Sequence, residues 1–144
     1  MIKIERFIKE DLCTVTMANS PAELTVLLVD DEQFILEIMK RILKGNGINT
    51  IDAVATTQEG LDLLEKKPYN FVFTDLNQNP SGIEVYKAAA AKGSEAYIMT
   101  GYAPDMQQAQ QVAEGHFLMK PFRVSAIDGI VKDYIARQKP SSQS

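Results

Sequence analysis

The fold of this chain is decided by the segment Val26–Asp31, VLLVDD, in which four apolar residues run directly into two carboxylates. Three later segments repeat this pattern of an apolar run that ends in a polar side chain. Phe71–Asp75 (FVFTD) ends in a carboxylate, Ala96–Thr100 (AYIMT) in a hydroxyl, and His116–Lys120 (HFLMK) in an ammonium. If these runs are strands of one parallel sheet, their polar ends share one edge of it.

Helix-like segments separate the strand-like ones from Leu24 onward, and the alternation gives five strands and five helices. This order is typical of an α/β fold, a parallel sheet with helices on both faces. Thr56 and Glu59 form a capping-box pattern that opens one of the helices. Ser81 and Glu84 repeat the pattern, which predicts a second capping box.

The shared edge of the sheet is the candidate site, because open α/β sheets bind ligands at the carboxyl ends of their strands. Two carboxylates close to a third would repel it unless a cation lay between them. Mg²⁺ suits such a site, since it takes one or two carboxylates and bridges phosphate oxygens. The residues that would meet there are Asp30, Asp31, Asp75, Thr100 and Lys120. They indicate a metal-assisted phosphoryl acceptor with Asp75 as nucleophile and Lys120 as charge partner.

Each site residue also has a structural interpretation when it is taken singly. Asp75 could make a turn at a strand end, and Asp30–Glu32 could form the cap and first turn of a helix. A threonine at a strand end is more often structural. A lone Lys120-Pro121 pair carries little information, although a cis bond would suit a tight turn there. The combination of these residues in order favours the phosphoryl acceptor.

Composition sets further limits on function. The 144 residues are 45% hydrophobic and 24% charged, as expected for a single globular domain. The net charge of -4 argues against direct nucleic-acid binding. The single cysteine, Cys13, excludes an internal disulfide and fits a reducing compartment. No apolar stretch approaches the ~18 residues that would cross a bilayer. We therefore expect a cytoplasmic protein that does not bind membranes.

We expect the domain to cover residues 24–138. Residues 1–23 form an N-terminal extension, for which a short helix and a floppy leader are equally compatible, and Met17 could be an internal start. Residues 139–144 form a polar tail. The tail is either a natural end or the stub of a connection to an output domain.

The stretch from Leu24 to Arg137 resembles the receiver domain of two-component response regulators, of the chemotaxis-regulator type. The resemblance implies a flavodoxin-like fold with sheet order 2-1-3-4-5. The motifs that carry it are Val26–Glu32, Phe73–Asn77, Met99–Tyr102 and Lys120–Phe122.

The same resemblance implies a role for each residue at the edge of the sheet. Asp75 is the phosphoacceptor. Asp31 binds Mg²⁺ directly, Asp30 binds it mainly through water, and the backbone carbonyl of Asn77 completes the protein ligands. Lys120 bridges the acidic pocket before phosphorylation and the phosphoryl group afterwards.

The resemblance also implies a switch and its partners. Thr100 swings toward the phosphate, Phe117 turns inward with it, and the surface of the fourth helix, fifth strand and fifth helix changes. A histidine kinase or a histidine phosphotransfer protein donates the phosphoryl group. The signal leaves through a downstream protein whose identity the sequence does not give, or through a phosphorylation-dependent homodimer. Such a domain is a signalling module rather than a turnover enzyme.

The loop after Asp75 departs from the family pattern. Receivers usually carry Met-Pro three and four residues after the phosphoacceptor and Gly eight after it. This chain has Gln78-Asn79 at those two positions, and Gly82 lies only seven residues after Asp75. The loop is therefore one residue short and unusually polar.

Two alternative functions remain open. A degenerate receiver that only binds partners is compatible with the altered loop. A Mg²⁺-dependent phosphatase of the haloacid dehalogenase superfamily also uses an Asp nucleophile on a similar sheet. That class needs Asp-x-Asp at the nucleophile strand, however, and this chain reads Asp75-Leu76-Asn77.

Overall fold

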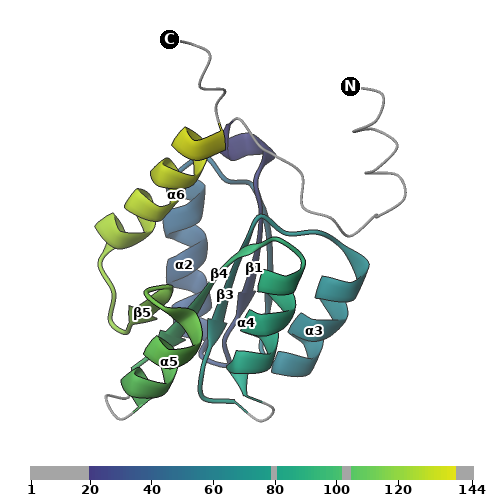
Figure 1. The fold of residues 1–144 in the computed structure, drawn as a ribbon. Coiled ribbons are helices and arrows are strands. Elements are labelled where there is room, and N and C mark those ends of the chain that lie inside the picture. Colours follow the sequence, from purple (N-terminus) through teal and green to yellow (C-terminus); the bar gives the residue numbers. More distant parts are fainter. Residues whose placement is uncertain (1–19, 79–80, 102–104, 139–144) are drawn as a thin grey trace.

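The computed structural model describes residues 20–78, 81–101 and 105–138 (Figure 1). These residues form a five-stranded parallel sheet in the order β2-β1-β3-β4-β5, which confirms the predicted flavodoxin-like fold. The predicted N-terminal extension up to residue 19, the tail 139–144, Cys13 and Tyr102 lie outside the described residues. The strands are β1 Thr25–Val29, β2 Thr50–Val54, β3 Phe71–Asp75, β4 Glu95–Thr100 and β5 Phe117–Met119.

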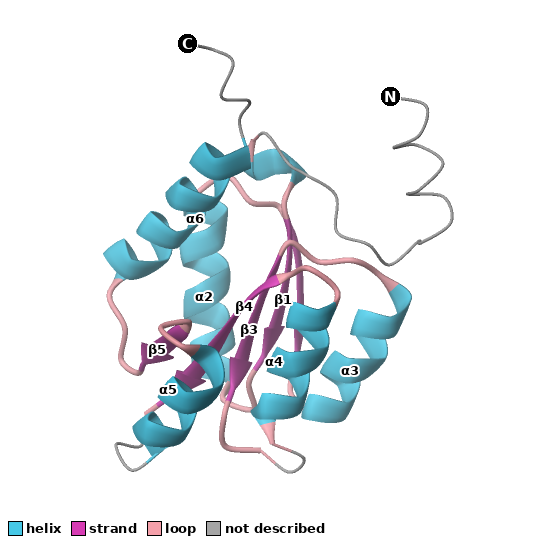
Figure 2. Cartoon of the chain, viewed as in Figure 1, coloured by secondary structure: helices cyan, strands magenta, loops and turns pink. Residues whose placement is uncertain are grey.

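Helices cover both faces of the sheet (Figure 2). Helices α2 and α6 pack on one face, and α3, α4 and α5 pack on the other. A 3-10 turn, η1 Pro21–Glu23, precedes β1, so the first α-helix is labelled α2. Among the described helices, none is both long and apolar enough to cross a membrane. The helices are α2 Gln33–Gly45, α3 Thr57–Lys66, α4 Gly82–Ala91, α5 Met106–Ala113 and α6 Val124–Gln138.

The alternation of side chains along β1 divides the core into two apolar layers. Val26 and Leu28 are fully buried under α2 and α6, whereas Leu27 and Val29 are fully buried under α3 and α4. Successive side chains of a strand point to opposite faces, so an apolar run of this length needs cover on both sides. The strand ends are consequently held in a rigid frame.

The two predicted capping boxes have different outcomes. At α3 the box is complete, because Thr56 Oγ1 accepts from Glu59 N at 3.1 Å and Glu59 Oε1 accepts from Thr56 N at 3.2 Å. At α4 the prediction is wrong in part. Ser81 caps the helix, but its Oγ accepts from Ile83 N at 3.2 Å instead of from the Glu84 amide. The reason is that the same hydroxyl donates to the carbonyl of Leu76, which turns it toward the preceding loop.

Helix α4 begins in direct contact with the end of β3. A Cβ atom on Gly82, its first residue, would overlap the carbonyl oxygen of Asp75 and lie 2.8 Å from the carbonyl carbon. Gly82 N also donates to the carbonyl of Leu76 at 3.2 Å. Only glycine allows so close an approach of two backbones. The position of Asp75 therefore depends on how α4 starts.

We expect Gly82→Ala to destabilise the fold by about 3 kcal/mol, because the added methyl group forces two backbone segments apart. Urea unfolding followed by circular dichroism measures the change. Gly129→Ala in α6 is the matched control, since its Cβ would have nothing within 4 Å. This change should stabilise the helix by about 0.5–1 kcal/mol. Equal stabilities for Gly82→Ala and wild type would show that the close approach is wrong.

Candidate functional site

Three carboxylates meet at the carboxyl edge of the sheet. Asp30 and Asp31 follow β1, Asp75 ends β3, and one oxygen of each lies within 4.8 Å of the other two. Asp30 is fully buried, Asp75 is 5% exposed and Asp31 is exposed. Parallel pairing of β1 with β3 brings the acids together, as the sequence predicted. Such a set of hard oxygen donors, reached by solvent on one side, is what Mg²⁺ prefers.

Lys120 extends from the end of β5 into this cluster. Its Nζ lies 2.7 Å from Asp30 Oδ2, 2.9 Å from Glu32 Oε1 and 3.3 Å from Asp75 Oδ1. The backbone amide of Lys120 donates to the carbonyl of Thr100 at 2.8 Å, so the end of β4 positions it. The bond between Lys120 and Pro121 is cis.

Negative charge is in excess in this pocket, where the ammonium of Lys120 contacts three carboxylates and Asp31 adds a fourth to the cluster. Burial raises the pKa of Asp75 to about 6; Lys120 opposes this rise and Asp30 adds to it. Burial also raises the pKa of Asp30 above its ordinary value, against the effect of Lys120. Burial would lower the pKa of Lys120, but its bonds to Asp30 and Glu32 outweigh burial and raise it. A divalent cation would relieve this imbalance.

Both carboxylate oxygens of Asp30 have partners within the cluster. Its Oδ1 accepts from Glu32 N at 2.8 Å. Its Oδ2 is buried and pairs with the ammonium of Lys120 at 2.7 Å. Asp31 and Asp75 add further carboxylate oxygens to the cluster, and hard oxygen donors are what Mg²⁺ prefers. The donor set of the site therefore fits Mg²⁺.

The helix-cap interpretation of Asp30–Glu32 does not describe this segment. Helix α2 begins at Gln33 with Glu32 as its N-cap, and the Glu32 side chain makes no capping bond to the described residues. Glu32 pairs with Lys120 instead, a contact that sequence reasoning missed. The only sequence signal for this contact is the position of Glu32 directly after two aspartates at the end of a strand.

Thr100 and Phe117 lie on neighbouring strands but in different surroundings. Thr100 ends β4 and is fully buried at the edge of the sheet that carries Asp75. Phe117 begins β5 and is half-buried on the face covered by α4 and α5. Thr100 is therefore near the acidic cluster and Phe117 is near α5. Their predicted movements remain predictions.

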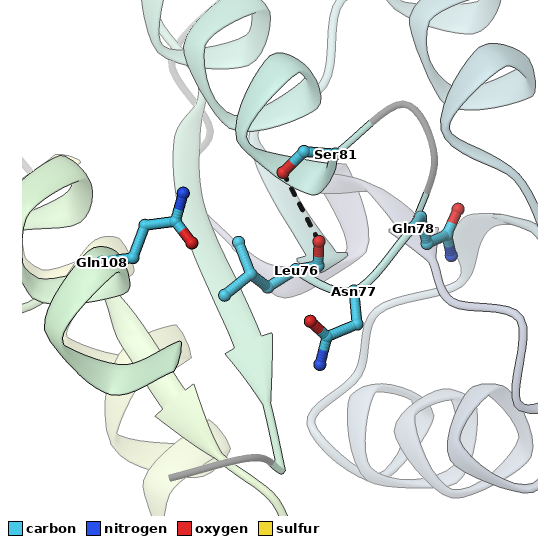
Figure 3. A pocket seen from close by; sticks show the side chains of 5 residues that line it. All are labelled: Leu76, Asn77, Gln78, Ser81 and Gln108. Atoms are coloured by element: carbon cyan, nitrogen blue, oxygen red, sulfur yellow. Dashed lines mark hydrogen bonds between the residues drawn. The ribbon is translucent and has the colours of Figure 1, made fainter. Parts of the chain in front are cut away.

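The segment after Asp75 borders an open cavity of about 550 Å³ (Figure 3). Asn77 is exposed, and the role of its carbonyl as a metal ligand remains a prediction. Residues 79 and 80, which complete the shortened loop, lie outside the described residues. The side chains that line the cavity are Leu76, Asn77, Gln78, Ser81 and Gln108.

Known proteins share both the sequence pattern and the fold. The sequence profile described as "Response regulator receiver domain" matches residues 26–132. The chain is 26% identical over 130 residues to "Response regulator Rre1" of Synechocystis sp.. That alignment covers 84% of this chain and 55% of Rre1, so the chain spans about half the length of this relative.

Solved structures show the same architecture. A CheY-like receiver domain from Methylobacillus flagellatus matches with a TM-score of 0.67 and 26% identity, over 77% of this chain and 98% of that chain. The receiver domain of a sensor histidine kinase from Pseudomonas aeruginosa PAO1 matches with a TM-score of 0.67, over 78% of this chain and 98% of that chain. That structure has a magnesium ion in its active-site cleft; at 19% identity, the likeness shows the fold. With its profile match over residues 26–132, this chain belongs to the response regulator receiver domain family, a family of signalling proteins.

Proposed function

We propose that this domain accepts a phosphoryl group on Asp75 from a phosphohistidine donor and acts as a switch in a two-component or phosphorelay pathway. The observation that carries the proposal is the pocket in which Asp75 Oδ1 lies 3.3 Å from Lys120 Nζ, beside two further aspartates. Nucleophile, charge partner and metal donors are thus adjacent. Phosphoryl transfer requires mainly such positioning and charge neutralisation.

The transfer itself is a displacement at phosphorus. A carboxylate oxygen of Asp75 forms the new P–O bond, and the P–N bond of the donor breaks with its electron pair going to the imidazole nitrogen. Because burial raises the pKa of Asp75 only to about 6, the carboxyl is ionised and nucleophilic at pH 7 and above. Lys120 pairs with a phosphoryl oxygen of the product.

Mg²⁺ would be held by Asp30, Asp31, Asp75 and the backbone carbonyl of Asn77. When bound, it supplies positive charge to the phosphoryl oxygens during transfer. Asp31, which follows β1, would be the direct carboxylate ligand, and Asp30 would act mainly through water. The alternative of a degenerate receiver has less support, because each acid that the chemistry needs is present in the cluster.

Phosphorylation would then change the shape of one face of the domain. Thr100 moves toward the phosphoryl group and donates a hydrogen bond to it from its hydroxyl. Phe117 turns inward into the space that the movement of Thr100 leaves. The face that changes is formed by α5, β5 and α6, because Phe117 packs beside α5. A histidine kinase or a histidine phosphotransfer protein is the donor. A downstream protein, or a second phosphorylated copy of the domain, recognises the altered face.

The phosphoacceptor can be tested directly. Incubation with acetyl phosphate and Mg²⁺ should add one phosphoryl group to the wild type, seen by intact mass spectrometry, and none to Asp75→Asn. Asp62→Asn, an exposed acid of α3 hydrogen-bonded to Gln58, is the matched control and should be modified like the wild type. Chelation with EDTA should prevent the modification. An unmodified wild type would favour the degenerate receiver, and a modified Asp75→Asn would assign the site elsewhere.

The raised pKa of Asp75 predicts how the stability of the metal-free protein depends on pH. The folded protein holds the Asp75 proton up to pH about 6, whereas the unfolded chain releases it near 3.8, so ionisation opposes folding. Relative to Asp75→Asn, wild type should lose stability as the pH rises from about 4 through 6. The difference should reach about 1–3 kcal/mol at pH 8.

Urea unfolding in EDTA at pH 4.5 and pH 8 measures this difference. Mg²⁺ at a hundred times its dissociation constant should stabilise wild type by about 2.7 kcal/mol at pH 8 and so cancel most or all of its deficit relative to Asp75→Asn. If the difference in stability between wild type and Asp75→Asn is the same at both pH values, the pKa of the Asp75 carboxyl is not perturbed by its surroundings.

A further inference from the structure

The segment that follows Asp75 is tied to the connection between β2 and α3 by the side chain of Gln78. Thr57 Oγ1 donates to Gln78 Oε1 at 3.1 Å, and Gln78 Nε2 donates to the carbonyl of Ala55 at 3.2 Å. Both ends of the amide are therefore engaged. Thr57 is 1% exposed and is the first residue of α3, so the anchor on that side is fixed.

The backbone of Asn77 is held between two fixed points. Gln78 N donates to the carbonyl of Leu76 at 3.0 Å, which closes a three-residue turn around Asn77. The Leu76 carbonyl also accepts from Gly82 N at 3.2 Å and from the Ser81 hydroxyl (Figure 3). Leu76 is thus attached to the start of α4, and Gln78 is attached to the start of α3.

Packing holds Leu76 but not Asn77. Leu76 is 3% exposed and lies in one apolar cluster with Ala109 and Ala113 of α5, whereas Asn77 is exposed beside the cavity. The segment borders the open cavity there, and Gln108 lies across from Leu76 (Figure 3). The Gln78 side chain extends away from Gln108, on the other side of Leu76. The hydrogen bonds of Gln78 consequently act next to the exposed Asn77 rather than at the buried Leu76.

We propose that Gln78 and Thr57 form a positioning pair that fixes the Asn77 carbonyl and thereby sets the affinity of the domain for Mg²⁺. The inference rests on the proposed function, in which that carbonyl is a metal ligand. Mg²⁺ requires nearly ideal octahedral geometry, so a ligand that moves freely costs affinity. Groups that orient metal ligands typically matter by about tenfold or more. By linkage, bound Mg²⁺ strengthens the bond between Gln78 and Thr57 to the same extent.

The test compares Mg²⁺ affinities by isothermal titration calorimetry in the absence of any phosphodonor. Gln78→Met removes both hydrogen bonds at similar side-chain length and should raise the dissociation constant about tenfold. Thr57→Val removes the hydroxyl that donates to Gln78 and should also raise the dissociation constant for Mg²⁺. Thr57→Ser keeps the hydroxyl and should bind Mg²⁺ like the wild type. The double variant Thr57→Val/Gln78→Met should bind no more weakly than Gln78→Met, because the two residues share one interaction.

Gln108→Met is the matched control, since it makes the same substitution on the other side of the same cavity. Its Mg²⁺ affinity should equal that of the wild type. At saturating Mg²⁺, Gln78→Met should still take one phosphoryl group from acetyl phosphate, which separates metal affinity from transfer. Gln78 lies in a partly exposed loop, so Gln78→Met decides the question even if Thr57→Val does not fold.

The possible results separate the inference from the function on which it rests. If wild type binds Mg²⁺ and Gln78→Met binds it with equal affinity, the positioning role of Gln78 is overturned. The phosphoacceptor role of Asp75 is then left intact. Wild type that neither binds Mg²⁺ nor is phosphorylated on Asp75 would overturn both. Equal weakening by Gln78→Met and Gln108→Met would assign the effect to the cavity as a whole and also overturn the positioning pair.

Discussion

The ammonium of Lys120 holds together a group of carboxylates that would otherwise repel one another. Its contacts of 2.7 Å to Asp30 and 3.3 Å to Asp75 join the ends of β5, β1 and β3 across the edge of the sheet. Asp30 and Asp75 are buried, so their charges are poorly solvated and depend on each other. One ammonium cannot balance the four acids around it. The same arrangement that permits folding therefore leaves the pocket ready for a cation.

The frame around this ion pair explains why the acids stay close in spite of their repulsion. Apolar strands buried on both faces fix the strand ends, and α4 begins against the Asp75 backbone at Gly82. Neither acid can move away without disturbing a buried strand or the start of a helix. The pKa of Asp75 is raised chiefly by burial in this frame, and the nearby charge of Asp30 adds to the rise.

The architecture and most of the site could be predicted from the sequence, because apolar runs that end in polar residues place those residues on one edge of a parallel sheet. The contacts that could not be predicted depend on which way a side chain turns between loops. Glu32 fits a helix start and is the N-cap of α2, but its side chain pairs with Lys120, 88 residues away. Ser81 turned toward Leu76 instead of completing a capping box. In the sequence, Gln78 stands out only as a departure from the family pattern, since the periodicity of apolar residues carries no information about its partner Thr57.

Charge and geometry would act on different properties of the metal site. The excess of carboxylates attracts any divalent cation, so it raises affinity without selecting among ions. Selection depends on how rigidly the ligands are held, because Ca²⁺ accepts flexible surroundings with six to eight oxygens whereas Mg²⁺ does not. In this chain the rigid part is the Asn77 backbone between Leu76 and Gln78. The Leu76–Gln78 segment, fixed by hydrogen bonds, would thus favour the smaller ion, and Gln78 would preserve the geometry that the chemistry needs.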